Sequence, residues 1–376
     1  MSKTFELIIS RSFLALPVVA LIALALSWGR SLPDAILAVL GLVLAASIIA
    51  AVHHAEVVAH RVGEPFGSLI LALAVTIIEV GMIVTLMLSS PDSSSELARD
   101  TVFAAVMITC NGIVGIAIVI KALRKRVATF KSEGVGGALA TIAVIATLSL
   151  VLPTFTTSTA GPTFSATQLT YAAAASLGLY LLFVFVQTYR HRDFFLPPML
   201  PKSESTKAES SNGESVKKAH AASPSRRTAI ISLALLTISL VGVVGLAKVT
   251  SPLIESAVSD LGLPQVVVAV SIALLVLAPE AVSAIRAAYL GRTQKSLNLA
   301  YGSAMASIGL TIPVIAVLSL VFGFNVALGL GGKEIVLLAV TLIVSTLTVV
   351  PGRATVLQGG VHLALFGAFL VLAVSP

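Results

Sequence analysis

The sequence predicts an all-α polytopic membrane protein with about 11 transmembrane helices, arranged as one extra N-terminal helix plus two inverted five-helix repeats. Of its 376 residues, 57% are hydrophobic and only 11% are charged, whereas soluble domains carry about 25% charged residues. The apolar runs are close to the roughly 20 residues that a helix needs to cross the hydrocarbon core, and they lack the alternation of a β-barrel. A polar segment in mid-chain separates two groups of such runs.

Eleven apolar runs emerge from windows of about 19 residues, and each predicts one membrane-spanning helix. In chain order they are Ser12–Trp28, Leu32–Val52, Phe66–Leu88, Val102–Leu123, Gly136–Leu152, Gln168–Thr188, Ala229–Lys248, Gln265–Leu290, Leu297–Phe322, Ile335–Val350 and Val356–Val374. The first run follows two basic residues, as a signal peptide would. Its apolar core is longer than the about 7–15 residues of such a peptide, and another run follows at once, so we expect it to be retained.

The polar segment, residues 190–227, divides the chain. It is rich in Ser, Glu and Lys and cannot bury a core, so we predict a disordered cytoplasmic linker. Residues 1–30 hold the N-terminal transmembrane helix. Five runs then lie in residues 31–189, the first repeat, and five in residues 228–376, the second. A repeat with an odd number of spans must insert its second copy upside down, which is the plan of many secondary transporters.

The basic residues predict how the chain is oriented. If the N-terminus is cytoplasmic, every Lys and Arg faces the cytoplasm except Arg30, Arg99, Lys248 and Lys333, as is typical of membrane proteins. We therefore predict a multi-pass protein of the bacterial inner (plasma) membrane with a cytoplasmic N-terminus. The net charge of +7 then belongs to loops beside the lipid bilayer, not to a nucleic-acid surface. The single cysteine, Cys110, excludes disulfide frameworks and cysteine-based metal sites.

Two glutamates interrupt the apolar runs. Glu79 lies near the middle of the third run and Glu280 follows Pro279 in the eighth, so each falls in the second run of its group of five. A carboxylate at the bilayer centre costs about 2.5–3.5 kcal/mol, and such residues are normally functional. The alternative is a structural role as hydrogen-bond partners between helices. Two acids at matching positions make that role less favoured.

If Glu79 and Glu280 meet between the repeats, their two negative charges match one divalent metal ion. Without a cation, burial and mutual repulsion favour protonated carboxyls. The same oxygens then bind either a cation or protons, which is the competition that an antiporter needs. Hard oxygen ligands favour Ca²⁺, which takes about 6–8 of them. Na⁺ and K⁺ stay open as alternatives if one carboxyl keeps its proton.

Other polar groups near the two acids are candidate secondary cation ligands. They are Thr76, one turn before Glu79, and Asn111, Ser303 and Ser307 in the runs that follow the acids. The small residues around Asn111 and Ser303 are also typical of close helix packing, which is the more common reason for them.

The histidines are not predicted to bind the transported cation. His53, Glu56 and His60 share one helical face, a spacing that could ligate a metal or sense pH. No fourth ligand accompanies them, so we expect a solvated helix end at the cytoplasmic border. His362, in the last run, is predicted to be a packing residue.

These motifs resemble those of the Ca²⁺/cation–proton antiporters of the CAX type, and most closely the bacterial calcium/proton antiporter branch. The resemblance rests on the runs Gly63–Val80, Leu277–Glu280, Asn298–Ser303 and Thr311–Pro313 and covers nearly the whole chain after the first span. It implies that Glu79 and Glu280 occupy the positions of the family's cation-binding acids.

The chain also departs from the family pattern. The Gly-Asn pair before each acid is Val75-Thr76 in the first repeat and Val276-Leu277 in the second, and Ala306 replaces a common glutamine. The bacterial branch shows the same substitutions, and its members look able to exchange Na⁺ or K⁺ as well as Ca²⁺. The resemblance therefore implies an antiporter and leaves its cation open.

We predict a secondary active antiporter, not an enzyme, that exports Ca²⁺ in exchange for H⁺ by alternating access and uses no cofactor. Na⁺/H⁺ or K⁺/H⁺ exchange on the same fold is the alternative. A cation channel or a non-transporting membrane scaffold is an alternative from a different class. An intramembrane protease is not supported, because the sequence has no HExxH or paired-Asp motif.

Overall fold

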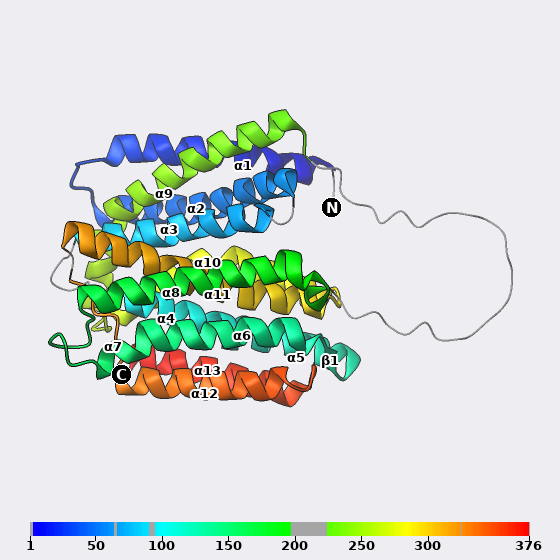
Figure 1. Ribbon diagram of the computed structural model, residues 1–376. Coiled ribbons are helices and arrows are strands. Elements are labelled where there is room, and N and C mark those ends of the chain that lie inside the picture. Colours follow the sequence, from blue (N-terminus) through cyan, green and yellow to red (C-terminus); the bar gives the residue numbers. More distant parts are fainter. Residues whose placement is uncertain (1–2, 64–65, 90–94, 197–223, 324, 376) are drawn as a thin grey trace, which may run out of the picture.

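The computed structural model describes residues 3–63, 66–89, 95–196, 224–323 and 325–375 (Figure 1). Long helices dominate these residues, which confirms the predicted all-α class. Most of the predicted linker lies outside them, as do Glu64 and Pro65 of the first motif, so the predicted disorder of the linker stays a prediction.

Apart from one or two residues at some ends, each predicted run lies within one helix or one continuous helical stretch, and π-helical (η1, η2, η3) and 3₁₀ (η4) segments adjoin some of the α-helices. The elements are α1 Lys3–Ser27, α2 Asp34–Val62, α3 Phe66–Ser89, α4 Leu97–Met107, η1 Ile108–Ile113, α5 Val114–Lys125, β1 Ala128–Thr129, α6 Ser132–Ala146, η2 Thr147–Val151, α7 Leu152–Phe155, α8 Ala166–Phe185, η3 Val186–Arg190, η4 Arg192–Phe195, α9 Arg226–Asp260, α10 Val266–Tyr289, α11 Thr293–Phe322, α12 Gly332–Val349, β2 Arg353–Ala354 and α13 Val356–Val374.

Among the described residues, ten helical stretches are long and apolar enough to cross a membrane, and the apolar part of α1, Ser12–Ser27, is a shorter apolar helix. Three helices extend well beyond the predicted runs, and α1 does so by beginning at Lys3 instead of Ser12. Helix α2 continues past Val52 and ends only at Gly63, whose φ of 77° favours glycine. Helix α9 has 35 residues, about 52 Å at 1.5 Å per residue, and so exceeds the hydrocarbon thickness. Hydropathy detects the part of a helix that lies in lipid, not its polar extension.

The helices run roughly parallel and form layers (Figure 1). At one side α9 packs against α1, α2 and α3, and at the other side α13 packs against α5 and α12. Helices α4, α6, α8, α10 and α11 lie between. Each side therefore combines elements that precede the predicted linker with elements that follow it.

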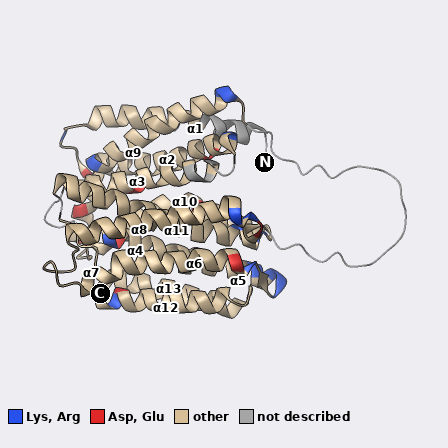
Figure 2. Ribbon diagram, in the orientation of Figure 1, with Lys and Arg blue, Asp and Glu red and all other residues tan. Residues whose placement is uncertain are grey.

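Charged residues gather at the two ends of the bundle (Figure 2). At one end, which we call the basic end, β1 pairs antiparallel with β2 through Ala128 and Ala354. There the Lys121 ammonium donates to the carbonyl of Gly291 at 2.9 Å. At the opposite end, the Arg99 guanidinium contacts Glu96 at 2.9 Å and Asp100 at 2.8 Å, and it donates to the carbonyl of Gly329 at 3.0 Å.

The π-helical segment η1 joins α4 and α5 where the sequence is small and polar. A Cβ at Gly112 would contact the ring of Phe366 at 3.4 Å, and one at Gly115 would meet Leu363 at 3.0 Å. Both glycines therefore allow α13 to approach closely, which agrees with the packing interpretation of this stretch. Gly302 differs, because nothing lies within 4 Å of the Cβ that it would carry.

Candidate functional site

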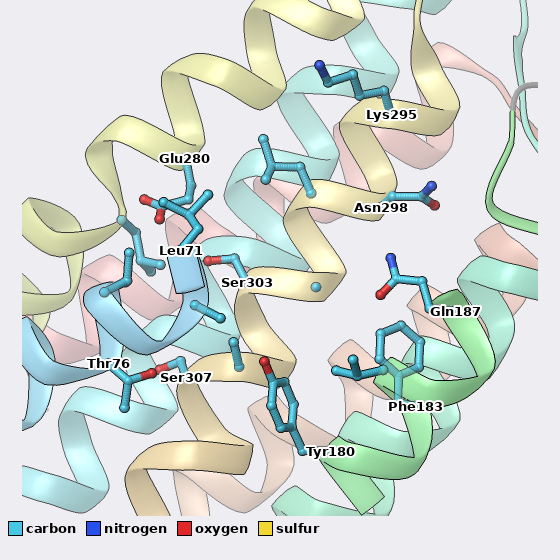
Figure 3. A pocket seen from close by; sticks show the side chains of 17 residues that line it. Leu71, Thr76, Tyr180, Phe183, Gln187, Glu280, Lys295, Asn298, Ser303 and Ser307 are labelled. Carbon is cyan, nitrogen blue, oxygen red and sulfur yellow. The ribbon is translucent and has the colours of Figure 1, made fainter. Parts of the chain in front are cut away.

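Helices α3, α8, α10 and α11 enclose a cavity of about 260 Å³ (Figure 3). Apolar side chains form much of its wall, as is usual for ligand sites. Its polar lining residues are Thr76, Tyr180, Gln187, Glu280, Lys295, Asn298, Ser303 and Ser307. Gln187, Lys295 and Asn298 belong to the parts of η3 and α11 that lie toward the basic end, so the cavity extends from that end into the bundle.

Glu79 lies beside this cavity on α3, with only 3% of its surface exposed. The hydroxyl of Ser307, on α11, is 2.8 Å from its Oε1 and 3.0 Å from its Oε2. Because Ser307 also lines the cavity, it stands between Glu79 and the open space. A hydrogen bond to a carboxylate is among the stronger kinds, so this contact orients the acid.

Glu280 lines the cavity directly from α10 and is 7% exposed. Its Oε2 atom is buried and has no hydrogen-bond partner among the described residues. The two acids whose charges act on it are Glu56 and Glu79. Pro279, just before it, cannot donate a backbone hydrogen bond to the carbonyl of Leu275 and so leaves that oxygen without its usual helical partner. A buried carboxylate oxygen without a partner is costly, which points to a ligand or a proton at this atom.

Most of the predicted secondary ligands lie around the same cavity. Thr76 and Ser303 line it, and Ser307 joins it to Glu79. Leu277 and Ala306 also line it, so two of the three positions where the family pattern has an amide side chain are apolar on this surface, and the third holds the hydroxyl of Thr76. The structure thus brings both acids and three hydroxyls together around one space, with few other oxygen atoms from side chains.

Asn111 is placed elsewhere. Its side-chain NH₂ donates to the Thr341 hydroxyl at 2.9 Å, and its Oδ1 is 3.0 Å from Nδ1 of His362. Nε2 of His362 is 3.1 Å from the Thr348 hydroxyl. Both ends of the amide are therefore engaged by α12 and α13, and the structure does not bring it to the carboxylates. His362, predicted to be a packing residue, is fully buried, and both of its ring nitrogens also have polar partners, which the sequence did not predict.

Two stretches, residues 35–189 and 231–375, match the family model described as sodium/calcium exchanger protein. Together they cover more than half of the chain. The protein belongs to this family. The exchanger is therefore a transporter and not an enzyme, and it exchanges cations across a membrane that it crosses several times.

Relatives of known name agree with this assignment. The exchanger is 45% identical over 333 residues to the protein y4hA of Sinorhizobium fredii, which is named as an ionic transporter, with 89% of this chain and 87% of that protein covered. It is 32% identical over 364 residues to the sodium-potassium/proton antiporter ChaA of Escherichia coli, with 95% and 94% covered.

Solved structures confirm the fold. The crystal structure of the H⁺/Ca²⁺ exchanger CAX superposes with a TM-score of 0.70 at 13% identity, covering 98% of this chain and 88% of that one. The structure of native YfkE gives a TM-score of 0.69 at 15% identity, covering 97% and 100%. The resemblance inferred from the sequence motifs is therefore confirmed at the level of family and fold.

The sequence analysis did not predict several residues in and around the exchanger's cavity. Lys295 and Asn298 line its outer part, and the Asn298 amide donates to the carbonyl of Phe195 in η4 at 2.7 Å. Glu56 interacts electrostatically with His60, Lys295 and Glu280, so it belongs to the surroundings of the cavity. The shared face of His53, Glu56 and His60 was the available signal for Glu56.

The histidines of that face do not act together. His53 stacks on Phe13 of α1 with ring centroids 4.2 Å apart, and the neighbouring His54 contacts the Phe13 carbonyl at 3.0 Å. His60 is exposed. Among the described residues, no three His, Cys, Asp or Glu side chains come together as a ready-made metal site.

Proposed function

We propose that the exchanger is a proton-coupled cation antiporter of the bacterial inner membrane that exports Ca²⁺ in exchange for H⁺ by alternating access. Glu79 and Glu280 carry the cation and the protons in turn. The observation that carries this proposal is the pair of buried carboxylates at one cavity, of which Glu280 has an oxygen without a partner. A pair of acids that must be neutralised by either protons or a cation couples the two fluxes without a separate device.

Charge favours a divalent substrate. Two ionised carboxylates carry −2, which one Ca²⁺ neutralises, and Ca²⁺ accepts flexible arrangements of hard oxygen ligands. Ser307, Ser303 and Thr76 supply hydroxyl oxygens near the acids, and water molecules would complete the coordination shell. Asn111 contributes indirectly, through the position of η1.

The charge of the loops supports the predicted orientation. The basic end holds Lys121, Arg124, Lys131 and Arg353, and positive charge is typical of cytoplasmic loops. With this end in the cytoplasm, the N-terminus is also cytoplasmic. The cavity then extends toward the cytoplasm, as expected of a conformation that loads Ca²⁺ from inside the cell.

Exchange of Na⁺ or K⁺ for H⁺ is the second candidate. It is favoured by Leu277 and Ala306, which leave the cavity poor in oxygen ligands. The likeness to the sodium-potassium/proton antiporter ChaA also favours it. A monovalent ion needs only one ionised carboxylate, so one of the two acids would keep its proton.

The test is proton flux in inverted membrane vesicles acidified inside by a proton pump, with Ca²⁺, Na⁺ or K⁺ chloride added outside. Calcium/proton antiport predicts that micromolar to millimolar Ca²⁺ dissipates the gradient and that Glu79→Gln and Glu280→Gln abolish the response. Glu133→Gln, the same change at an exposed acid, should leave it intact. Protons that share the site also predict a KM for the cation that rises as the pH falls.

Each other outcome is informative. A response to Na⁺ or K⁺ but not to Ca²⁺ would support the second candidate. Ion conductance without counterflow of protons would indicate a channel. Full activity of the Glu79→Gln, Glu280→Gln double variant would remove the two acids from the mechanism.

A further inference from the structure

A second buried polar cluster lies away from the cavity, where η1 meets α12 and α13. His362 is fully buried, and so is Asn111. Their side chains, together with Thr341, Thr348 and Met107, form a continuous chain of contacts: Thr348 Oγ1 to His362 Nε2 at 3.1 Å, His362 Nδ1 to Asn111 Oδ1 at 3.0 Å, Asn111 Nδ2 to Thr341 Oγ1 at 2.9 Å, and Thr341 Oγ1 to Met107 Sδ at 3.5 Å. None of these residues lines the cavity.

One arrangement of hydrogen atoms satisfies the whole chain. Because the Asn111 NH₂ group donates to Thr341, its Oδ1 atom faces His362 and must accept from Nδ1–H. Nε2 of a neutral His362 is then an acceptor, and the Thr348 hydroxyl donates to it. The ring thus acts as a fixed bridge with a donor toward η1 and an acceptor toward α12. A phenyl ring, which is slightly larger, would provide neither.

The cluster sits behind the helices that carry the cavity. Segment η1 packs against α10, which bears Glu280, and against α11, which bears Ser303 and Ser307. On its other side, Gly112 in η1 and Gly115 at the start of α5 allow α13 to approach closely. A π-helical segment is a weak point of a helix and often marks a functional place. Segment η1 therefore lies between the cavity helices and α13, and the His362 ring contacts it through Asn111.

We propose that His362 is a positioning residue of the transport cycle. Its bond to Asn111 holds η1 in the conformation described here, and this bond breaks and forms again as the cavity exchanges access between the two sides. His362 touches neither the cation nor Glu79, so it sets the rate of the conformational step and not the affinity for the cation. This inference rests on the proposed alternating access, but its test includes a readout that needs no transport.

A natural cysteine can report on the movement of η1. Cys110 is the only cysteine, it immediately precedes Asn111 within η1, and it is fully buried. Reaction with membrane-permeant N-ethylmaleimide therefore reports how often η1 opens. A second readout is the split between kcat and KM for the transported cation, since an effect confined to kcat places a residue outside the binding site.

Two amide variants of His362 distinguish a role of its hydrogen bonds from a role in packing alone. In His362→Asn the amide nitrogen can take the place of Nδ1 and still donate to Asn111, whereas in His362→Gln the longer side chain carries its amide toward Thr348. His362→Phe keeps an aromatic ring and removes the hydrogen bonds to both Asn111 and Thr348. We expect His362→Asn to behave nearly like the unmodified protein. His362→Gln and His362→Phe should lower kcat and speed Cys110 labelling, each by about tenfold, as for loss of a buried hydrogen bond.

Several outcomes would overturn the proposal. One is that His362→Asn and His362→Gln change kcat and Cys110 labelling equally. Others are that the variants change KM alone, or that they lower the melting temperature with labelling and kcat unchanged. If His362→Gln and His362→Phe do not fold, Asn111→Leu removes the same bond from the other side and should speed Cys110 labelling. Labelling that changes as expected in a protein that moves no protons would refute the proposed antiport, and with it a role in transport, but would still show that His362 holds η1 in place. Unchanged labelling in an active antiporter would refute only the positioning role.

Discussion

Ser307 on α11 places its hydroxyl within 2.8 and 3.0 Å of both carboxylate oxygens of Glu79 on α3, across 228 positions of the chain. One hydroxyl has a single hydrogen, so it donates to one oxygen at a time while its lone pairs stay available. The hydroxyl oxygen of Ser307 can therefore orient Glu79 in the absence of a cation and serve as a cation ligand when one is bound. Several expectations follow from this contact and its surroundings.

Ser307→Ala should raise the KM for the transported cation by about tenfold and leave kcat nearly unchanged, because hydrogen bonds to charged groups contribute about 1.5–3 kcal/mol. Ion-driven proton flux at graded cation concentrations measures both constants. Ser271→Ala on α10 is the matched control, since Ser271 is exposed and donates only to the backbone of its own helix. A KM that does not move would show that the Ser307 hydroxyl is not part of the site.

Ala306→Gln should shift the preference of the exchanger toward Ca²⁺ by about three- to tenfold over Na⁺ and K⁺, because an added amide oxygen brings the cavity closer to the 6–8 oxygens that Ca²⁺ takes. Ala306 lines the cavity, so the new side chain has space to enter it. Competition between the chlorides in the vesicle assay gives the ratio. Ala281→Gln serves as control, because Ala281 follows Glu280 in the sequence but does not line the cavity. An equal shift in ion preference there would contradict the explanation.

Glu56→Gln and Lys295→Gln should have opposite effects on cation entry. Glu56 adds negative charge near Glu280, whereas Lys295 places a positive charge in the cavity lining. Removing the acid should raise KM about two- to fivefold and removing the base should lower it, and both effects should shrink as ionic strength rises. Salt-independent effects would mean that the side chains act by contact and not through their charge.

Gly115→Ala should destabilise the protein by about 1–3 kcal/mol, because its methyl group would lie only 3.0 Å from Leu363 and 3.1 Å from Cβ of His362. Gly137→Ala is the matched change in a helix, with nothing within 4 Å, and should be neutral or slightly stabilising. Thermal unfolding in detergent compares the two. Equal melting temperatures would show that α13 can move away from α5 at little cost.

The sequence predicts most of this fold because each membrane helix is encoded locally, by a run of apolar residues. The eleven runs correspond to helices or helical stretches, whereas the extensions of α1, α2 and α9 and the π-helical segments were not predicted. The two acids were equally visible, since a charge within an apolar run stands out without any knowledge of its neighbours.

The partners of polar residues are harder to predict, because they depend on how helices pack. Asn111 and His362 are 251 positions apart, and nothing in either local sequence indicates that they meet. Asn111 was expected beside the carboxylates because an amide is a suitable ligand. Its π-helical segment and the close approach of α13 direct it instead to α12 and α13.

The pairing of β1 with β2 has a mechanical consequence. It joins the loop between α5 and α6 to the loop between α12 and α13, and so links chain from before and after the predicted linker at the basic end. Helix α9, from the later part of the chain, packs in turn on α1, α2 and α3. Under the proposed alternating access, we therefore expect each moving body to contain helices from both parts of the chain. A protein cut between residues 196 and 224 should still assemble from its two fragments, because helices of each fragment pack against helices of the other.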